Sequence, residues 1–189
     1  VAEKYDPTVN WATHVDMKTG RPQVVAKFST AQNGPDVNTK GICPAALGSK
    51  DQQPASFDPV TKLFYVPANE WGMEIWNEPV TYKKGAAYLG AGFTIKTIND
   101  EYIGAMRAID PKTGKTVWEV KNNAPLWGGV LTTAGDLVFW GTPDGYTKAA
   151  DARTGKVLRQ FQTGSGVVAP PITWKDGTDQ YVSVVSGWG

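Results

Sequence analysis

The chain has 189 residues, enough for one ordinary domain with a buried core. Its 19 Lys and Arg residues nearly balance 18 Asp and Glu residues, and this formal charge of +1, without long runs of one sign, argues against nucleic acid or an anionic membrane as partner. The chain is rich in Gly (21), Pro (13) and Trp (8), and no apolar run reaches the roughly 20 residues of a membrane-spanning helix, so we expect short strands and tight turns.

Two early segments share a turn motif in which Thr follows Asp by three residues. The segment "HVDMKTGRPQVV" (14–25) carries Asp16, Thr19 and Gly20, and "SFDPVTKLFYVPA" (56–68) keeps the Asp and Thr but has Lys62 in place of Gly. Asp at the entrance of such a turn accepts backbone N–H groups two or three residues on, and Gly supplies a positive φ. Both segments are therefore predicted to be hairpin turns and faint copies of one repeat.

Residues 69–103 interrupt this pattern. The stretch is too apolar and aromatic for a disordered linker and too rich in Gly for a confident helix, so we predict an irregular insertion that packs as a cap beside a binding site. Within it, Glu70, Glu74 and Glu78 have the spacing that would align three carboxylates on a helix. A metal site is one reading of this trio, but Gly72 and Pro79 weaken the helix, so a solvated face is favoured.

The clearest repeat lies in the second half of the chain. "AIDPKTGKTVW" (108–118) and "AADARTGKVLR" (149–159) place Asp110 and Asp151 in register, 41 residues apart. Between them we predict strands at 130–133 and 137–141, turns at 134–136 and 143–145, and a further strand that enters the second copy. The opening of this unit recurs near Ile172, which lies 41 residues after Leu131.

Four short strands per period of about 40 residues are typical of a β-propeller blade. We therefore predict an all-β chain in which residues 1–189 form one partial β-propeller domain of about four blades, within a larger ring. Trp118, at the end of one repeat, is expected to pack between neighbouring blades, because a blade cannot bury both of its faces alone. Arg159 occupies the equivalent position in the next copy and has no explanation from the sequence.

Few residues suggest chemistry by pattern alone. His14 is the only His and Cys43 the only Cys, which excludes a zinc cluster and a His-based triad within this chain. Trp127 precedes two glycines at the start of a predicted inner strand, where inter-blade packing is favoured over ligand contact. Asn69 ends an apolar strand, where its amide would either bind a ligand or cap a turn, and the pattern leaves this open.

Several long runs closely resemble the C-terminal half of the quinoprotein alcohol dehydrogenases. They include "ICPAALGSKDQQPASFDPVTKLFYVPANEWGMEIWNEP", "RAIDPKTGKTVWE", "PLWGGVLTTAGDLVFWGTPDGY" and "FQTGSGVVAPPITWKDGTDQYVSV". The resemblance implies an eight-bladed propeller and a periplasmic enzyme. Such an enzyme oxidises primary alcohols to aldehydes with pyrroloquinoline quinone (PQQ) and a calcium or lanthanide ion, and passes electrons to a c-type cytochrome. A homodimer of the longer protein is a further expectation.

By the same resemblance, Asn69 matches an asparagine that contacts the quinone oxygens, and Trp127 with Gly128 matches a contact at the quinone edge. Trp188 matches a position near the substrate cavity. The resemblance overrides the packing preference for Trp127, so these four residues are the expected cofactor-binding residues. It places the metal ligands and the catalytic base before this segment, so none is expected here and the chain alone is expected to be inactive.

One departure from the family pattern bears on the substrate. Methanol-oxidising members have a cysteine where this chain has Gly72, and they join it to a cysteine equivalent to Cys43. The resemblance therefore implies that Cys43 remains a thiol and that the enzyme is closer to ethanol-type members, including lanthanide-using ones. The alternative is a non-catalytic propeller that serves as a scaffold or binding module.

Overall fold

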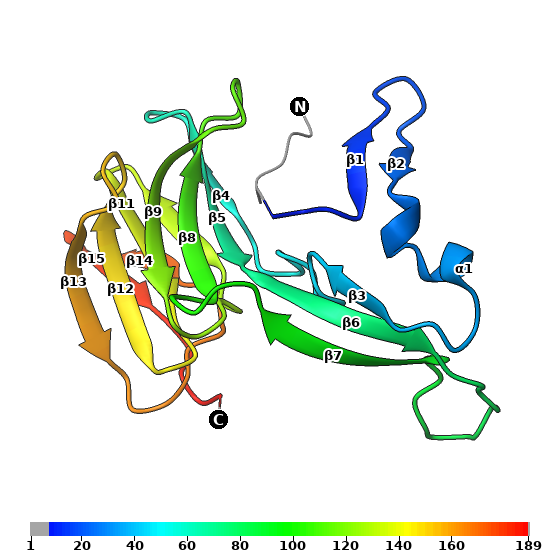
Figure 1. Cartoon of the computed structure of the whole chain (residues 1–189). Helices are drawn as coiled ribbons and strands as arrows, with labels where there is room; N and C mark the ends of the chain where they lie inside the picture. The colour runs from blue at the N-terminus through cyan, green and yellow to red at the C-terminus, as the bar shows by residue number, and fades with distance from the viewer. Residues whose placement is uncertain (1–7, 189) are drawn as a thin grey trace.

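The computed structural model describes residues 8–188, whose regular structure is almost entirely antiparallel β-sheet (Figure 1). Two sheets have four strands each and are called the first and second blade. The first blade contains β4 (Ser56–Asp58), β5 (Leu63–Asn69), β8 (Gly104–Ile109) and β9 (Thr116–Asn122). The second blade contains β10 (Val130–Thr133), β11 (Leu137–Gly141), β12 (Tyr146–Asp151) and β13 (Val157–Gln162).

The other strands form smaller sheets. β14 (Ile172–Asp176) and β15 (Asp179–Ser183) make a hairpin after the second blade, and β1 (Ala12–Val15) pairs with β2 (Pro22–Val24). A three-stranded sheet contains β3 (Thr39–Ile42), β6 (Trp71–Asn77) and β7 (Ala91–Thr97). Two short helical turns, η1 (Ala26–Phe28) and α1 (Thr30–Asn33), precede β3. No helix within residues 8–188 is long and apolar enough to span a membrane.

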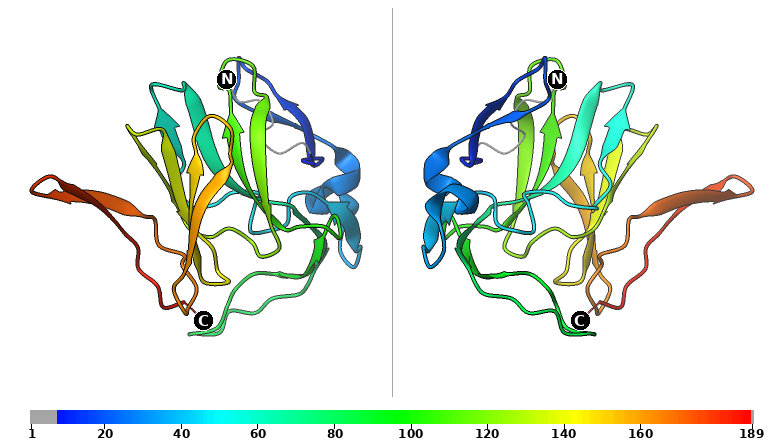
Figure 2. Two further views of the ribbon diagram at one scale, coloured as in Figure 1. Left: turned by 90° about the vertical axis from the view of Figure 1, so that its left-hand side faces the viewer. Right: turned by 90° about the vertical axis from the view of Figure 1, so that its right-hand side faces the viewer.

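These sheets confirm the predicted all-β class and the four-stranded unit. In each blade the strands pair in chain order, and the two blades stand side by side with the β14–β15 hairpin projecting beyond the second (Figure 2). The strands predicted at 130–133 and 137–141 are β10 and β11. The division of residues 1–189 into about four blades stays a prediction, because the other sheets of the described range have two or three strands.

The Asp and Thr-Gly motif folds as predicted in three copies. Asp16, Asp110 and Asp151 each accept a backbone N–H from two residues on, at 2.8 to 3.0 Å, and the glycine four residues on has a φ of 70° to 72°. That glycine also donates its N–H to the carbonyl of the Asp in each copy. The motif therefore closes the turns between β1 and β2, between β8 and β9, and between β12 and β13.

The fourth copy forms the predicted turn, but this turn lies at a different position in its sheet. Asp58 accepts N–H groups from Val60 and Thr61, and Lys62 takes the positive φ of 60° that Gly has elsewhere. This turn joins β4 to β5, the first two strands of a blade, whereas Asp110 joins the last two. Its prediction as a blade repeat was wrong because Asp and Thr specify a local turn and not its position in a sheet.

Residues 69–103 are more regular than predicted. The chain leaves the first blade after β5, forms the β6–β7 hairpin and returns at β8, and the Glu70 N–H donates to the Ile103 carbonyl at 2.7 Å to close its base. Figure 1 shows this hairpin, called the arm, extending away from the blades. Residues 78–89 at its tip are exposed, so only the base of the arm matches the predicted packed cap.

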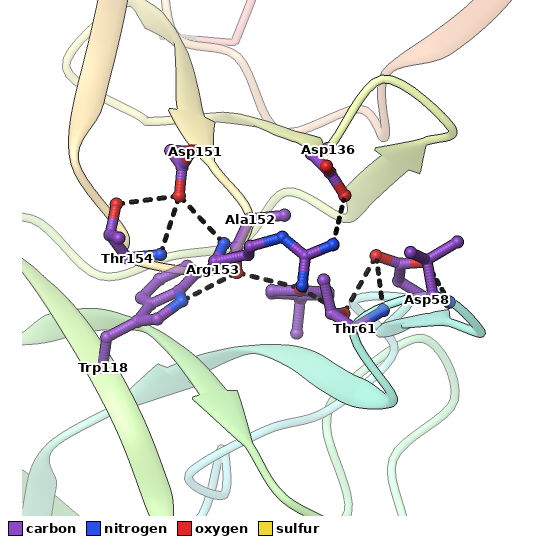
Figure 3. A network of polar contacts seen from close by, with 10 residues as sticks. Asp58, Thr61, Trp118, Asp136, Asp151, Ala152, Arg153 and Thr154 are labelled. Atoms are coloured by element: carbon purple, nitrogen blue, oxygen red, sulfur yellow. Dashed lines mark hydrogen bonds and ion pairs between the residues drawn. The ribbon is translucent and has the colours of Figure 1, made fainter.

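The two blades pack through Trp118, as the sequence predicted. Its indole Nε1 donates to the Ala152 carbonyl at 2.9 Å, and the Tyr65 hydroxyl donates to the same oxygen at 3.0 Å (Figure 3). A Cβ added at Gly155 would lie 2.6 Å from the indole Cδ2 of Trp118. The indole therefore lies directly on the glycine turn of the next blade, within a core cluster that also contains Met106.

Arg159 lies at the ladder position equivalent to Trp118, opposite Ala149 as Trp118 is opposite Ala108. It is exposed and lines a hollow of about 730 Å³ whose other walls include Phe161 and Val182. Arg159 thus differs from Trp118, which is buried against Gly155, in being exposed within residues 8–188.

We predict that Gly155→Ala destabilises the protein by about 2 to 4 kcal/mol, because the new methyl group meets the Trp118 ring at a positive φ. Thermal unfolding followed by circular dichroism measures the loss. Gly20→Ala is the matched control, since Gly20 has the same turn conformation with nothing within 4 Å of an added Cβ. Equal losses for the two variants would show that the indole contact contributes nothing.

A second prediction concerns acid pH. The pKa of Asp110 lies below its usual value because the Lys112 N–H and the Thr113 hydroxyl bind the carboxylate, and the Thr154 hydroxyl and N–H lower the pKa of Asp151. A lowered pKa adds stability that is complete above the unfolded pKa and is lost as pH falls through the folded one. Melting temperature should therefore fall less steeply between about pH 5 and pH 3 in Asp110→Asn/Asp151→Asn than in the original chain. Parallel pH profiles would contradict this account.

Candidate cofactor site

Three segments meet at one end of the two blades. They are the end of β5 with Asn69, the loop 123–129 that enters β10, and the segment 163–171 that enters β14. A Cβ added at Gly129 would lie 2.5 Å from Pro54 Cγ and 2.8 Å from Pro170 Cβ. Residues that lead into β4, β10 and β14 therefore touch one another, which brings the first strands of three successive sheets together at a common centre.

Asn69 is buried, with 1% of its surface exposed, and its carboxamide binds the backbone of Leu126. Its Oδ1 accepts the Leu126 N–H at 2.6 Å, and its Nδ2 donates to the Leu126 carbonyl at 3.1 Å. The side chain therefore joins the first blade to the loop that carries Trp127 and Gly128.

Gln53, which the sequence analysis missed, binds the same peptide. Its Nε2 donates to the Leu126 carbonyl at 2.9 Å, and its Oε1 accepts the Asp51 N–H at 2.6 Å. Gln53 and Leu126 are each 1% exposed. We call Gln53, Asn69 and Leu126 the Leu126 clasp. No sequence signal identifies Gln53, because a Gln in a polar loop has no distinctive spacing.

Trp127 is half-buried and packs on the base of the arm. Its ring centroid lies 5.2 Å from that of Trp71, with the planes inclined at 50°, and Trp71 Nε1 donates to the Gly48 carbonyl at 2.7 Å. This tilted contact fixes one side of the indole. The sequence analysis missed Trp71, which the arm brings to the site.

The glycine after Trp127 lies close to the protein backbone. A Cβ at Gly128 would be 3.3 Å from the carbonyl oxygens of both Gly141 and Val167, so an added methyl group would fit only if these carbonyl groups moved slightly. The main chain at Gly128 is therefore held close to the centre where the three sheets meet.

Trp188 is reached through the same segment. Its backbone pairs with Gly166, and the Gly166 N–H donates to the Trp188 carbonyl at 2.9 Å. The side chain is 52% exposed. Of the four predicted residues, the structure joins Asn69, Trp127 and Gly128 through one loop and links Trp188 to Gly128 through residues 166–167.

The three glutamates do not form a common site, because this segment is a strand and not a helix. Glu70 forms a buried ion pair with Arg107, Glu74 pairs with Lys96, and Glu78 accepts a hydrogen bond from Trp76. Within residues 8–188 no group of three or more His, Cys, Asp or Glu side chains is placed to hold a metal ion. The metal alternative for the trio was wrong, and the favoured solvated face was wrong for Glu70, which is buried.

The Glu70–Arg107 pair lies beside the site. Arg107 is 3% exposed and its Nε also donates to Glu119 Oε2 at 2.7 Å. Burial opposes the charge of Arg107, but the hydrogen bonds to Glu70 and Glu119 outweigh it and raise its pKa. This pair fixes the residue after Asn69, where the arm leaves the blade.

Comparison with known proteins agrees with this architecture. A family model described as "Outer membrane protein assembly factor BamB" matches residues 103–183. The chain is 56% identical over 185 residues to the quinoprotein alcohol dehydrogenase PedH of Pseudomonas putida and 51% identical to a quinoprotein ethanol dehydrogenase of the same species. Each alignment covers 96% of this chain and 31% and 30% of the respective relative.

The solved structure of a europium-containing methanol dehydrogenase superposes with a TM-score of 0.90 at 44% identity, over 96% of this chain and 32% of that one. The chain thus spans about a third of the length of the relatives it matches. This chain belongs to the quinoprotein alcohol dehydrogenase family.

Proposed function

We propose that this chain is part of a PQQ-dependent dehydrogenase that oxidises primary alcohols to aldehydes. The main support is the Leu126 clasp, which holds Trp127 and Gly128 at the meeting point of three sheets, in a chain 56% identical to a quinoprotein alcohol dehydrogenase. PQQ is a flat quinone that accepts two electrons from the alcohol when bound.

The residues present fit part of a site for a flat cofactor. Trp127 offers an indole that is only half-buried, and the carbonyl and N–H groups at Gly128 belong to a main chain without an obstructing side chain. Trp188 adds a second indole that is 52% exposed. We propose that Trp127 and Gly128 hold the edge of the quinone and that Trp188 borders the alcohol. Asn69 was expected from the resemblance to contact the quinone oxygens, but both polar atoms of its amide bind Leu126 in this structure, so the role we propose for it is to orient Trp127 and Gly128.

The metal and the catalytic base belong to the rest of the longer protein in this proposal. The relatives include a lanthanide-dependent methanol dehydrogenase that is 50% identical to this chain, so calcium and a lanthanide are both retained as candidate ions. We also propose a periplasmic location, a c-type cytochrome as electron acceptor and a homodimer of the longer protein.

The surroundings of Cys43 support an ethanol-type substrate preference. A Cβ at Gly72 would lie 3.1 Å from Cys43 Sγ, close to the separation of about 3 Å across a Cβ–S–S unit. Gly72 thus lies where the resemblance puts the partner cysteine of methanol-oxidising members, and it provides no thiol. We therefore propose that the enzyme accepts primary alcohols broader than methanol.

The second candidate function is a non-catalytic scaffold. It is favoured by the description of the matching family model, an outer-membrane assembly factor, which covers residues 103–183. That range contains the second blade and the hydrogen bond from Trp118 to the Ala152 carbonyl, both of which are structural features.

The deciding experiment uses the full-length protein that contains this chain. We expect the apoprotein, loaded with PQQ and either calcium or a lanthanide, to reduce an artificial dye with ethanol, at a higher kcat/KM than with methanol. Trp127→Ala should weaken PQQ binding by about tenfold or more, because an aromatic contact is lost.

Trp174→Ala is a control, since Trp174 stacks on Tyr181 in the β14–β15 hairpin and not on the proposed site. Absence of PQQ-dependent turnover with either ion, together with no bound quinone absorbance, would favour the scaffold. Turnover that is unchanged in Trp127→Ala would remove that indole from the site.

A further inference from the structure

We propose that Gln53 is a positioning residue for the cofactor site and acts through the Leu126 peptide. The inference rests on the proposed function and adds a residue, from the loop before β4, that does not itself contact the cofactor. It follows from the buried hydrogen bonds around Leu126 and from the place of that residue directly before Trp127.

The orientation of the Gln53 amide is fixed by its two partners. The Asp51 N–H is a donor, so the Gln53 atom 2.6 Å from it must be the carbonyl oxygen. The NH₂ group then faces the Leu126 carbonyl at 2.9 Å, which is an acceptor. Both polar atoms of the Gln53 amide have a hydrogen-bond partner, and Gln53 is 1% exposed. Rotation of the amide would therefore leave buried polar groups unpaired.

Leu126 is held on both sides of its backbone. Its carbonyl accepts from Gln53 and Asn69, and its N–H donates to Asn69, so three hydrogen bonds fix this single residue. Four residues on, the Val130 N–H donates to the Pro54 carbonyl at 3.1 Å. Residues 53–54 therefore lie alongside residues 126–130, between the two blades.

These contacts determine the orientation of Trp127 and Gly128. Because consecutive peptides share backbone atoms, a shift of the Leu126 carbonyl changes the direction of the Trp127 indole and of the Gly128 main chain. The Trp71 ring packs on one side of that indole. Gln53 therefore sets the position of the groups that would meet the quinone edge.

The test measures PQQ affinity in the full-length apoprotein by quenching of tryptophan fluorescence. Gln53→Met keeps the length of the side chain and removes both hydrogen bonds, and we expect its Kd for PQQ to rise roughly five- to tenfold. Gln53→Glu keeps the acceptor for Asp51 and loses the donor to Leu126, and it should show a comparable or larger rise. If Gln53→Met does not fold, the Gln53→Glu measurement decides.

Ser56→Ala is the matched control. Ser56 Oγ and Thr132 Oγ1 form a 2.7 Å hydrogen bond between β4 and β10, so this variant weakens the same pair of blades away from Leu126. We expect it to lower the melting temperature and to leave the Kd for PQQ unchanged. Selective loss of affinity in the Gln53 variants supports a positioning role.

Two results would overturn the inference. Gln53 variants that bind PQQ as tightly as the original protein, or a Ser56→Ala variant that loses as much affinity, would reduce Gln53 to a stabilising residue. These results can be distinguished from failure of the proposed function. If the proposed function is wrong, the unmodified protein itself binds no PQQ, and the positioning role fails with it.

Discussion

The contact of the Trp118 indole with the next blade is the constraint on which the rest of the structure depends. It combines a large apolar area with a hydrogen bond to the Ala152 carbonyl, and it requires that Gly155 has no side chain. A sheet with two apolar faces is not stable alone, so this contact determines how closely successive blades approach. The approach then fixes where the inner strands lie.

The candidate cofactor site results from the close approach of the blades. Once the first strands of successive sheets converge, the residues that precede them have little space, and Gly129 fits between Pro54 and Pro170 only because it lacks a Cβ. The loop before β10 must also satisfy its backbone without water, and Asn69 and Gln53 do so at Leu126. Packing between blades and the geometry of Trp127 are therefore parts of the same arrangement.

The sequence predicted those features whose causes are local. Asp110 and Asp151 revealed their turns because Asp, Thr and Gly act within five residues, and Trp118 followed from the repeat. The same local chemistry misplaced Asp58, since the turn it makes occurs between different strands. Trp71 and Gln53 were missed because their roles depend on contacts with residues far along the chain, over 50 residues away in the case of the Trp71–Trp127 pair.

A crystal structure of the full-length protein grown with PQQ tests the central claim most directly. The account predicts quinone density against Trp127 and Gly128, where the blades converge, with the Asn69 carboxamide still bonded to Leu126. Density for the quinone elsewhere in the protein, or an Asn69 side chain turned away from Leu126, would contradict it.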